Sequence, residues 1–158
     1  MTVQFVVEDG TGKSTATSYA TVAQYRQYWE NRGVDYSATA QSLIETKLNT
    51  ATEYIDTTYT FDGTPLLTTQ SLEWPRTDVL TGYDEPVSNA SVPQRVIDAT
   101  CYLAAQDGLQ FVDDGIASIS YGPISKTFSR PGGQKQFPVA DKLLKEFILQ
   151  GSRIMRVN

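Results

Sequence analysis

Residues 39–57 read TAQSLIETKLNTATEYIDT, and this stretch decides the fold. Its apolar side chains recur at intervals of three and four for about five turns, the pattern of an amphipathic α-helix with one buried face. The residues on that face are Ala40, Leu43, Ile44, Leu48, Ala51, Tyr54 and Ile55. The sequence therefore predicts a long helix against which the other elements pack.

Two further helices are predicted before residue 110. Thr21 is followed three residues later by Gln24, which is a capping-box signature, and Gly33 is a suitable end for the helix that begins there. Pro93 suits the first position of a helix that ends at Gly108. Together with the central helix, these segments favour a small helical bundle.

A last helix is predicted from Pro138 to Gly151. Its apolar face consists of Val139, Leu143, Leu144, Phe147 and Ile148. The residues beyond it form a short tail in which apolar side chains lie between two arginines.

From Ile116 to Phe128 the apolar period changes to two, which indicates β-structure. Gly122-Pro123 separates two alternating runs, so the segment is either a hairpin or one bent strand. An isolated hairpin is only marginally stable in water, and contact with a neighbouring subunit would stabilise it. The candidate inter-subunit residues are Ile119, Tyr121, Ile124 and Phe128.

The predicted fold is mainly α: a bundle of three to four helices with an extended N-terminal arm, a β-hairpin and a C-terminal tail. The arm and its loop occupy residues 1–20, with Val3 to Val7 as a short strand or extended segment, and the helical core domain occupies 21–115. The hairpin or bent strand covers 116–130, and the C-terminal helix and tail cover 131–158.

The connection between the second and third helices holds Gln70-Ser71-Leu72-Glu73-Trp74-Pro75-Arg76, which we interpret as an architectural element. Leu72 and Trp74 are two residues apart in an extended segment, so they point to the same side and anchor the connection on the core. Pro75 stiffens the segment. Arg76 presents a planar fork of donors suited to loop carbonyls or a neighbouring carboxylate.

Composition argues against an enzyme. The chain of 158 residues has no histidine and one cysteine, so it lacks the commonest general base and the commonest metal ligand. Cys101 lies on a predicted helix and is expected to be buried filler. The acidic pairs Glu8-Asp9, Asp84-Glu85 and Asp113-Asp114 could in principle serve acid–base or metal chemistry, but each lies in a turn beside glycine or proline.

The class of protein and its compartment also follow from composition. Hydrophobic residues make up 40% and charged residues 20%, which is typical of one ordinary globular domain. No apolar run is long enough to span a membrane, and the N-terminus lacks a signal-peptide pattern. We therefore expect a soluble protein made in the cytoplasm, with no membrane partner.

Gly12-Lys13-Ser14-Thr15 imitates the end of a phosphate-binding loop. The full motif needs a glycine five residues before Gly12, where this chain has Val7, and polar linker follows where a helix should begin. We therefore expect no nucleotide site here.

Charge is divided unevenly along the chain. Residues 1–114 carry 16 acidic and 6 basic groups, a balance of −10, whereas residues 115–158 carry 2 acidic and 7 basic groups, a balance of +5. Such asymmetry indicates two surfaces that face different partners, although a solvated basic tail without a specific partner would give the same count.

Six short motifs follow one another along the chain in a characteristic order. They are Val6-Val7-Glu8-Asp9-Gly10-Thr11-Gly12, Ser18-Tyr19-Ala20-Thr21-Val22, Trp74-Pro75-Arg76, Val92-Pro93, Gly122-Pro123-Ile124, and Gly151 followed by Arg153. In this order they resemble the head–tail connector (adaptor) proteins of tailed bacteriophages, many of which carry the label "putative DnaT-like ssDNA-binding". The likeness spans nearly the whole chain, with a departure at the phosphate-loop-like run after Gly12.

The resemblance implies a virion protein assembled in the host cytoplasm into a ring, usually of twelve copies, at the head–tail interface. Such a ring docks on the portal protein, meets a tail or tail-completion protein, and lets double-stranded genomic DNA pass through its lumen without specific binding. It implies no cofactor, no metal and no catalytic residue. The basic region 142–158 becomes the candidate portal contact, with Arg153, Ile154, Met155, Arg156, Val157 and Asn158 as its tail residues.

The alternative function is a single-stranded-DNA-binding module. Such modules combine basic grooves with stacking aromatics, and the chain has 17 aromatic residues. Basic and aromatic residues are interleaved only sparsely, at Lys126-Thr127-Phe128, and the sequence pI is about 4.6. A static binder usually shows a basic stripe and a high pI, so charge favours the connector.

Overall fold

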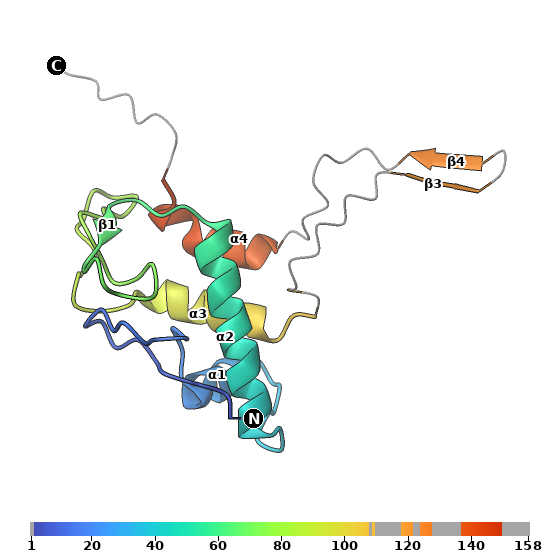
Figure 1. Cartoon of the computed structure of the whole chain (residues 1–158), viewed down its shortest axis with the longest axis horizontal. Helices are drawn as coiled ribbons and strands as arrows, with labels where there is room; N and C mark the ends of the chain where they lie inside the picture. Colours follow the sequence, from blue (N-terminus) through green and yellow to red (C-terminus); the bar gives the residue numbers. More distant parts are fainter. Residues whose placement is uncertain (1, 108, 110–117, 122–123, 128–136, 150–158) are drawn as a thin grey trace.

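The computed structural model describes residues 2–107, 109, 118–121, 124–127 and 137–149. Within these ranges the chain is mainly helical, as predicted, with one short two-stranded sheet inside the body and one hairpin (Figure 1). The helices are α1 (Val22–Glu30), α2 (Gln41–Thr58), α3 (Gln94–Ala104), α4 (Pro138–Leu144) and the 3₁₀ turn η1 (Lys145–Phe147). The strands are β1 (Thr64–Pro65), β2 (Arg76–Thr77), β3 (Ser118–Tyr121) and β4 (Ile124–Thr127).

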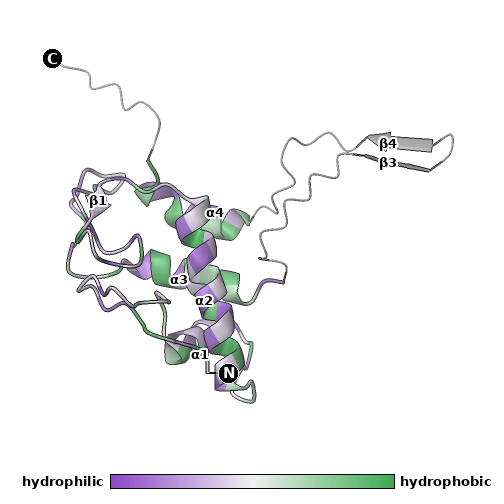
Figure 2. Cartoon of the chain, in the orientation of Figure 1, coloured by the Kyte–Doolittle hydropathy of each residue, from purple (hydrophilic) through white to green (hydrophobic). Residues whose placement is uncertain are grey.

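Helix α2 is the centre of the body. It packs against α1 and α3, and α3 packs in turn against α4. Figure 1 shows α2 running the length of the body, with α1 near one end and α4 near the other. Hydrophobic and hydrophilic residues alternate along these helices in Figure 2, because each helix turns one face to the shared core.

The buried face of α2 is narrower than predicted. Ile44, Leu48, Ala51 and Ile55 are fully buried, but Leu43 is 49% exposed. Successive residues of a helix are rotated by about 100°, so Leu43 lies well to one side of Ile44 and misses the core. The prediction that Leu43 belongs to the buried face was wrong.

The N-terminus of α1 has the capping box that the sequence predicts. The Thr21 hydroxyl accepts from the Gln24 amide at 3.0 Å, and the Gln24 side chain accepts from the Thr21 amide at 2.8 Å. The helix ends at Glu30, and the turn beyond it places Gly33 at a φ of 78°. The capping box therefore lies at the start of α1, and Gly33 lies just beyond its end.

The last helix is shorter than predicted. Helix α4 ends at Leu144, one 3₁₀ turn follows, and the backbone is extended again at Ile148. The segment there pairs with the chain after α2: the amide of Asp62 donates to the carbonyl of Phe147 at 2.8 Å, and Leu149 donates to Thr60 at 2.9 Å. These inter-segment hydrogen bonds replace those of a continued helix, so the predicted helix end at Gly151 was wrong.

The N-terminal segment folds back on itself. The Thr17 amide donates to the Val6 carbonyl at 2.7 Å, and the Glu8 amide donates to the Ser18 carbonyl at 2.9 Å. Val3 to Val7, expected to be a short strand or an extended segment, has one bridge, between Val7 and Ser18. Residues 2–20 therefore form a loop whose two limbs are joined.

Strands β3 and β4 form an antiparallel hairpin, which resolves the alternative between a hairpin and one bent strand. Ser118 pairs with Thr127 and Tyr121 pairs with Ile124. Among the described helices and strands these two contact each other alone. The Gly122-Pro123 turn and Phe128 lie outside the described residues.

We predict that Leu48→Ala destabilises the chain and that Leu43→Ala does not. Leu48 is fully buried at the centre of α2, so its truncation should lower the free energy of unfolding by about 3 kcal/mol. Leu43→Ala is the matched control on the same helix and should change it by less than about 0.5 kcal/mol. Urea titration followed by circular dichroism measures both, and equal losses in the two variants would contradict this account of the core.

Candidate functional site

The connection between α2 and α3 is fixed to the core by Trp74, which is fully buried. Its ring packs edge-on against Phe61 at 5.4 Å and against Phe147 at 5.3 Å between centroids. Leu72 is half-buried against the same core, and the Trp74–Pro75 peptide bond is cis. The start of the connection, its middle and the C-terminal segment therefore meet at one indole.

Arg76 holds the connection closed from within. Its side chain donates to the carbonyls of Asp62 and Gly63, each at 2.8 Å, and to the carboxylate of Glu73 at 2.6 Å. The residue is only 5% exposed, so its charge needs these partners in place of water. The donor fork is thus used for loop carbonyls and one carboxylate, and it serves the architecture.

A second buried polar network joins the N-terminal segment to α2 and to this connection. The Tyr19 hydroxyl donates to the carboxylate of Asp56 at 2.5 Å and accepts from the Trp74 amide at 3.1 Å. The Glu73 amide donates to the other carboxylate oxygen of Asp56 at 3.1 Å. One carboxylate therefore orients both segments, which Ser71 also joins by donating to the carbonyls of Lys13 and Ala16.

Burial raises the pKa of Asp56 to about 6, because a carboxylate away from water is costly to ionise. The hydrogen bonds from Tyr19 and Glu73 lower that pKa and limit the rise. Burial and the neighbouring Asp56 charge together raise the pKa of the Tyr19 hydroxyl well above its ordinary value. The hydroxyl therefore remains a donor throughout the physiological range.

The phosphate-loop-like segment is occupied by a carboxylate of its own chain. The side chain of Glu8 accepts from the amides of Gly10 at 2.8 Å, Gly12 at 3.0 Å and Lys13 at 2.8 Å. Successive amides converge in this way when glycines adopt positive φ, here 98° at Gly10 and 78° at Gly12. The anion nest exists, but Glu8 fills it.

The lysine of this segment also has partners already. Lys13 donates through Nζ to the Val7 carbonyl at 3.0 Å and pairs with Asp9 at 3.0 Å. The hydroxyl of Thr11 and the ammonium of Lys13 lower the pKa of Asp9 to about 2. The amides and the ammonium that a nucleotide phosphate would use therefore already have partners within the segment.

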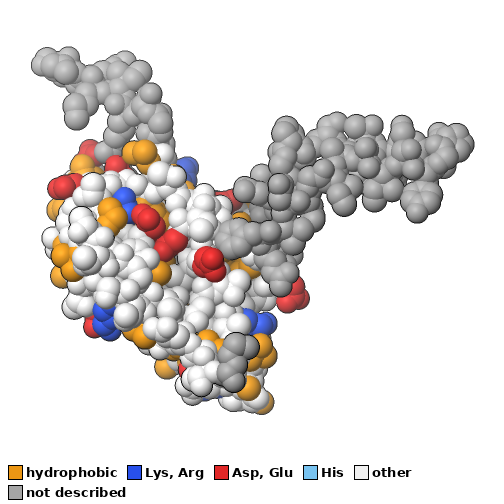
Figure 3. Space-filling model, in the orientation of Figure 1, with side chains coloured by type: hydrophobic (Ala, Val, Ile, Leu, Met, Phe, Trp, Pro, Cys, Tyr) orange, Lys and Arg blue, Asp and Glu red, His pale blue; other side chains and the backbone are white. Residues whose placement is uncertain are grey.

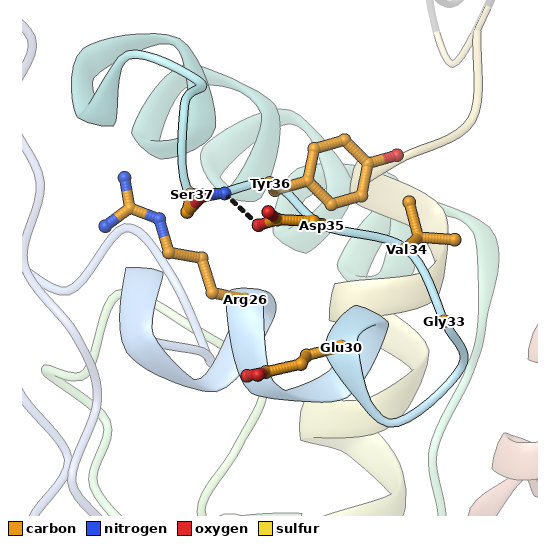
Figure 4. A pocket seen from close by; sticks show the side chains of 7 residues that line it. All are labelled: Arg26, Glu30, Gly33, Val34, Asp35, Tyr36 and Ser37. Atoms are coloured by element: carbon orange, nitrogen blue, oxygen red, sulfur yellow. Dashed lines mark hydrogen bonds between the residues drawn. The ribbon is translucent and has the colours of Figure 1, made fainter.

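An open hollow of about 470 Å³ lies between α1 and the segment that follows it. Figure 4 shows Arg26 and Glu30 on the helix side and the carboxylate of Asp35 on the facing segment. Arg26 donates to the Thr39 carbonyl at 3.1 Å, and Asp35 accepts from the Ser37 amide at 2.7 Å. Two carboxylates beside one guanidinium do not favour an anionic ligand. The lining residues are Arg26, Glu30, Gly33, Val34, Asp35, Tyr36 and Ser37.

The surface of the body shows no basic stripe on the face drawn in Figure 3, where Lys and Arg side chains are scattered among acidic and uncharged ones. Several aromatic rings of the body pack on one another rather than stand free. Trp29 stacks on Tyr102 at 6.3 Å, and its Nε1 donates to the Cys101 carbonyl at 3.1 Å. Nucleic-acid bases would have to displace such contacts in order to stack.

The described residues hold no group of three or more metal-ligating side chains and no helix long and apolar enough to cross a bilayer. Cys101 is buried, and burial raises the pKa of its thiol to about 12, so it is not a thiolate at neutral pH.

The structure brings together one of the three predicted groups of site residues. Leu72, Trp74, Pro75 and Arg76 form the anchored connection described above. Ile119, Tyr121 and Ile124 lie on β3 and β4. The tail residues Arg153, Ile154, Met155, Arg156, Val157 and Asn158 lie outside the described residues, as does the acidic pair Asp113-Asp114.

Sequence reasoning missed Glu8, Tyr19 and Asp56 as the residues that organise the polar interior. A signal for Glu8 was available, since a carboxylate followed by Gly10 and Gly12 is the composition of a self-filled nest. Tyr19 and Asp56 are 37 residues apart, and no local pattern links them.

We predict that Glu8→Gln destabilises the N-terminal segment. The amide replaces one acceptor by a donor that faces a backbone N–H, so the free energy of unfolding should fall by about 2 kcal/mol. Glu30→Gln, at an exposed position of α1, is the matched control. Thermal unfolding of both variants is the measurement, and equal stability of the two would count against a structural role for Glu8.

We further predict a pH-dependent step in stability from Asp56. The pKa of Asp56 is raised in the folded chain, so protonated Asp56 stabilises the fold. This stabilisation is fully present below about pH 4, the usual pKa of an aspartate in an unfolded chain, and is lost as the pH rises through about 6. The difference in free energy of unfolding between wild type and Asp56→Asn should change by about 3 kcal/mol over this window. Urea titrations at several pH values measure it, with Glu53→Gln on the same helix as control, and a flat difference would contradict the assignment.

Comparison with known proteins gives one family. The profile of the family described as "Putative DnaT-like ssDNA binding protein" matches residues 3–158, nearly the whole chain. No curated protein and no solved structure matches the chain. The chain therefore belongs to the family described as "Putative DnaT-like ssDNA binding protein".

Proposed function

We propose that this chain is the subunit of a head–tail connector ring of a tailed bacteriophage, which docks on the portal and extends the DNA channel toward the tail. The ring is a structural part of the virion and performs no chemistry. Its subunits are expected to assemble side by side, usually twelve to a ring, with a tail or tail-completion protein on the far side. The proposal is based on the resemblance of the ordered sequence motifs to head–tail connector proteins.

The observation that carries the proposal is the division of charge. Residues 1–114, which form most of the helical body, have a balance of −10, and residues 115–158 have a balance of +5. DNA must slide through a conduit, and each phosphate neutralised by a wall cation would add affinity that holds the duplex still. An acidic body suits a passage, and a basic end suits an acidic docking partner.

The contacts inside the body support a structural role for the subunit. Arg76, Trp74 and Asp56 tie the long connection between α2 and α3 to the core at several points. The body therefore holds its shape without a ligand, and hairpin β3–β4, which contacts no other described helix or strand, remains available to a neighbour.

The tail residues 153–158 are the proposed portal contact. Arg153 and Arg156 can form bidentate pairs with carboxylates, and Ile154, Met155 and Val157 between and beside them can fill apolar grooves. The arginines would orient the tail on the portal, and the apolar side chains would bury surface in the contact.

A second candidate is binding of single-stranded DNA, and the description of the family favours it more directly than it favours the connector. Such binding would use bases stacked on aromatic rings beside cations. Within the described part, Arg32 lies 3.5 Å over the Tyr28 ring, next to the stacked Trp29 and Tyr102. This corner of the body is where single-stranded DNA would bind.

We predict that removal of residues 152–158 prevents the chain from joining phage particles. The truncation deletes both arginines of the tail and leaves the described body intact, so incorporation should fall by at least about tenfold because the anchoring residues are lost. Mass spectrometry of purified particles measures it, with Lys47→Ala as a control that removes one cation from the body. Unchanged incorporation would overturn the portal contact, and absence of the wild-type chain from particles would overturn the connector.

The same purified chain separates the two candidate functions. If the chain is a connector, fluorescence anisotropy with a labelled oligonucleotide of about 20 nucleotides should give a dissociation constant above about 0.1 mM at about 150 mM salt. Submicromolar binding that weakens steeply with salt, and that Trp29→Ala abolishes, would establish the second candidate instead.

A further inference from the structure

The segment from Asp78 to Pro86, which we call the acidic turn, is a rigid projection on the body. The amide of Thr81 donates to the Glu85 carbonyl at 2.8 Å, and the Asp84 amide donates to the Thr81 carbonyl at 3.0 Å. The Thr81 hydroxyl accepts from the amides of Tyr83 and Glu85, each at 3.3 Å. The tip is therefore held by its own backbone.

The acidic turn presents a large aromatic side chain to solvent. Tyr83 is 89% exposed, the highest value among the exposed large hydrophobic residues of the described chain, and Leu80 is also exposed. Residues 77–94 contain three acidic groups and no lysine or arginine. A rigid aromatic tip loses little conformational freedom on binding, so it is well suited to dock against an apolar surface with basic neighbours.

The C-terminal helical segment carries exposed apolar and basic side chains of that kind, which we call the lysine face. Val139 is 44% exposed on α4 and Leu149 is 55% exposed just after η1. Lys142 and Lys145 are exposed between them, and neither forms an ion pair within the described part of the chain. The acids of the same segment are engaged elsewhere: Asp141 accepts from Tyr59, and Glu146 pairs with Arg95 at 3.1 Å.

We propose that the acidic turn of one copy docks on the lysine face of the next copy. Tyr83 and Leu80 would cover Val139 and Leu149, while Glu85 and its acidic neighbours would meet Lys142 and Lys145. The proposal rests on the proposed ring, for which it names one contact between subunits besides any that the hairpin makes.

Repetition of this contact from copy to copy can build a closed assembly. The two surfaces consist of different residues and each copy has one of each, so a head-to-tail arrangement of copies uses a heterologous interface. Such interfaces close into rings when the rotation between copies permits it. One contact of this size is weak, and ring closure makes many of them act together.

Charge reversal tests the contact in the full chain. Glu85→Lys and Lys142→Glu should each raise the dissociation constant of self-association by about tenfold, and the double variant should restore it. Tyr83→Ala should weaken association by a similar factor, whereas Leu43→Ala and Glu53→Lys, at exposed positions of α2, should not. Sedimentation velocity at several protein concentrations measures all of these. Single reversals that associate like wild type, or a double variant that is not rescued, would overturn the contact.

Photo-crosslinking identifies the surface that is contacted. With p-benzoylphenylalanine in place of Tyr83, and isotopically light and heavy chains mixed, cross-links should join one copy to residues 138–149 of another. The same probe in place of Leu43 is the control. Cross-links to another part of a second copy would overturn the proposed occupant. A monomeric wild type that gives no cross-link at about 0.1 mM would overturn it too.

These experiments can overturn the subunit contact without overturning the proposed function, and the reverse. Wild-type chain that enters particles while the charge reversals have no effect would overturn only the subunit contact. Rescue by the double reversal in a chain that is absent from particles would establish the contact and overturn only the connector.

Discussion

The indole of Trp74 is the contact on which the rest of the structure depends. The ring is fully buried and packs against Phe61, shortly after α2, and against Phe147 of the C-terminal segment, while the backbone amide of Trp74 donates to Tyr19 of the N-terminal loop. A body this small buries limited apolar area, so one residue that contacts these segments supplies much of their cohesion. The connection between α2 and α3 is therefore a structural element rather than a passive link.

Charge is distributed unevenly along the chain, although the apolar core is continuous. The apolar interior is continuous from α1 to α4, whereas acidic residues dominate the first two thirds of the sequence and basic residues the remainder. Charge pattern of this kind governs association and solubility, not the fold. The proposed connector would need this pattern, with a body that repels DNA and a basic end that meets an acidic partner.

Much of the fold could be predicted from local patterns. The three-and-four spacing around Leu48, the capping box at Thr21 and the change of period after Ile116 each depend on residues close in sequence. The errors occurred where distant segments compete: Ile148 leaves the helix to pair with Phe61. The anchored connection could be predicted because each of its residues has a typical role: tryptophan packs on a core, proline stiffens the backbone, and arginine donates to carbonyls or a carboxylate. The Tyr19–Asp56 bond was not, since only tertiary packing brings these residues together.

The carboxylate of Glu8 has a consequence for how the N-terminal loop behaves in a cell. Cytosol is rich in nucleotides, and an empty cradle of backbone amides would compete for them continuously. Because a covalently attached anion already sits in that cradle at a very high local concentration, dissolved phosphate esters cannot displace it. The loop therefore keeps one shape whether or not phosphate esters are present, and the proposed ring would require such uniformity of every copy.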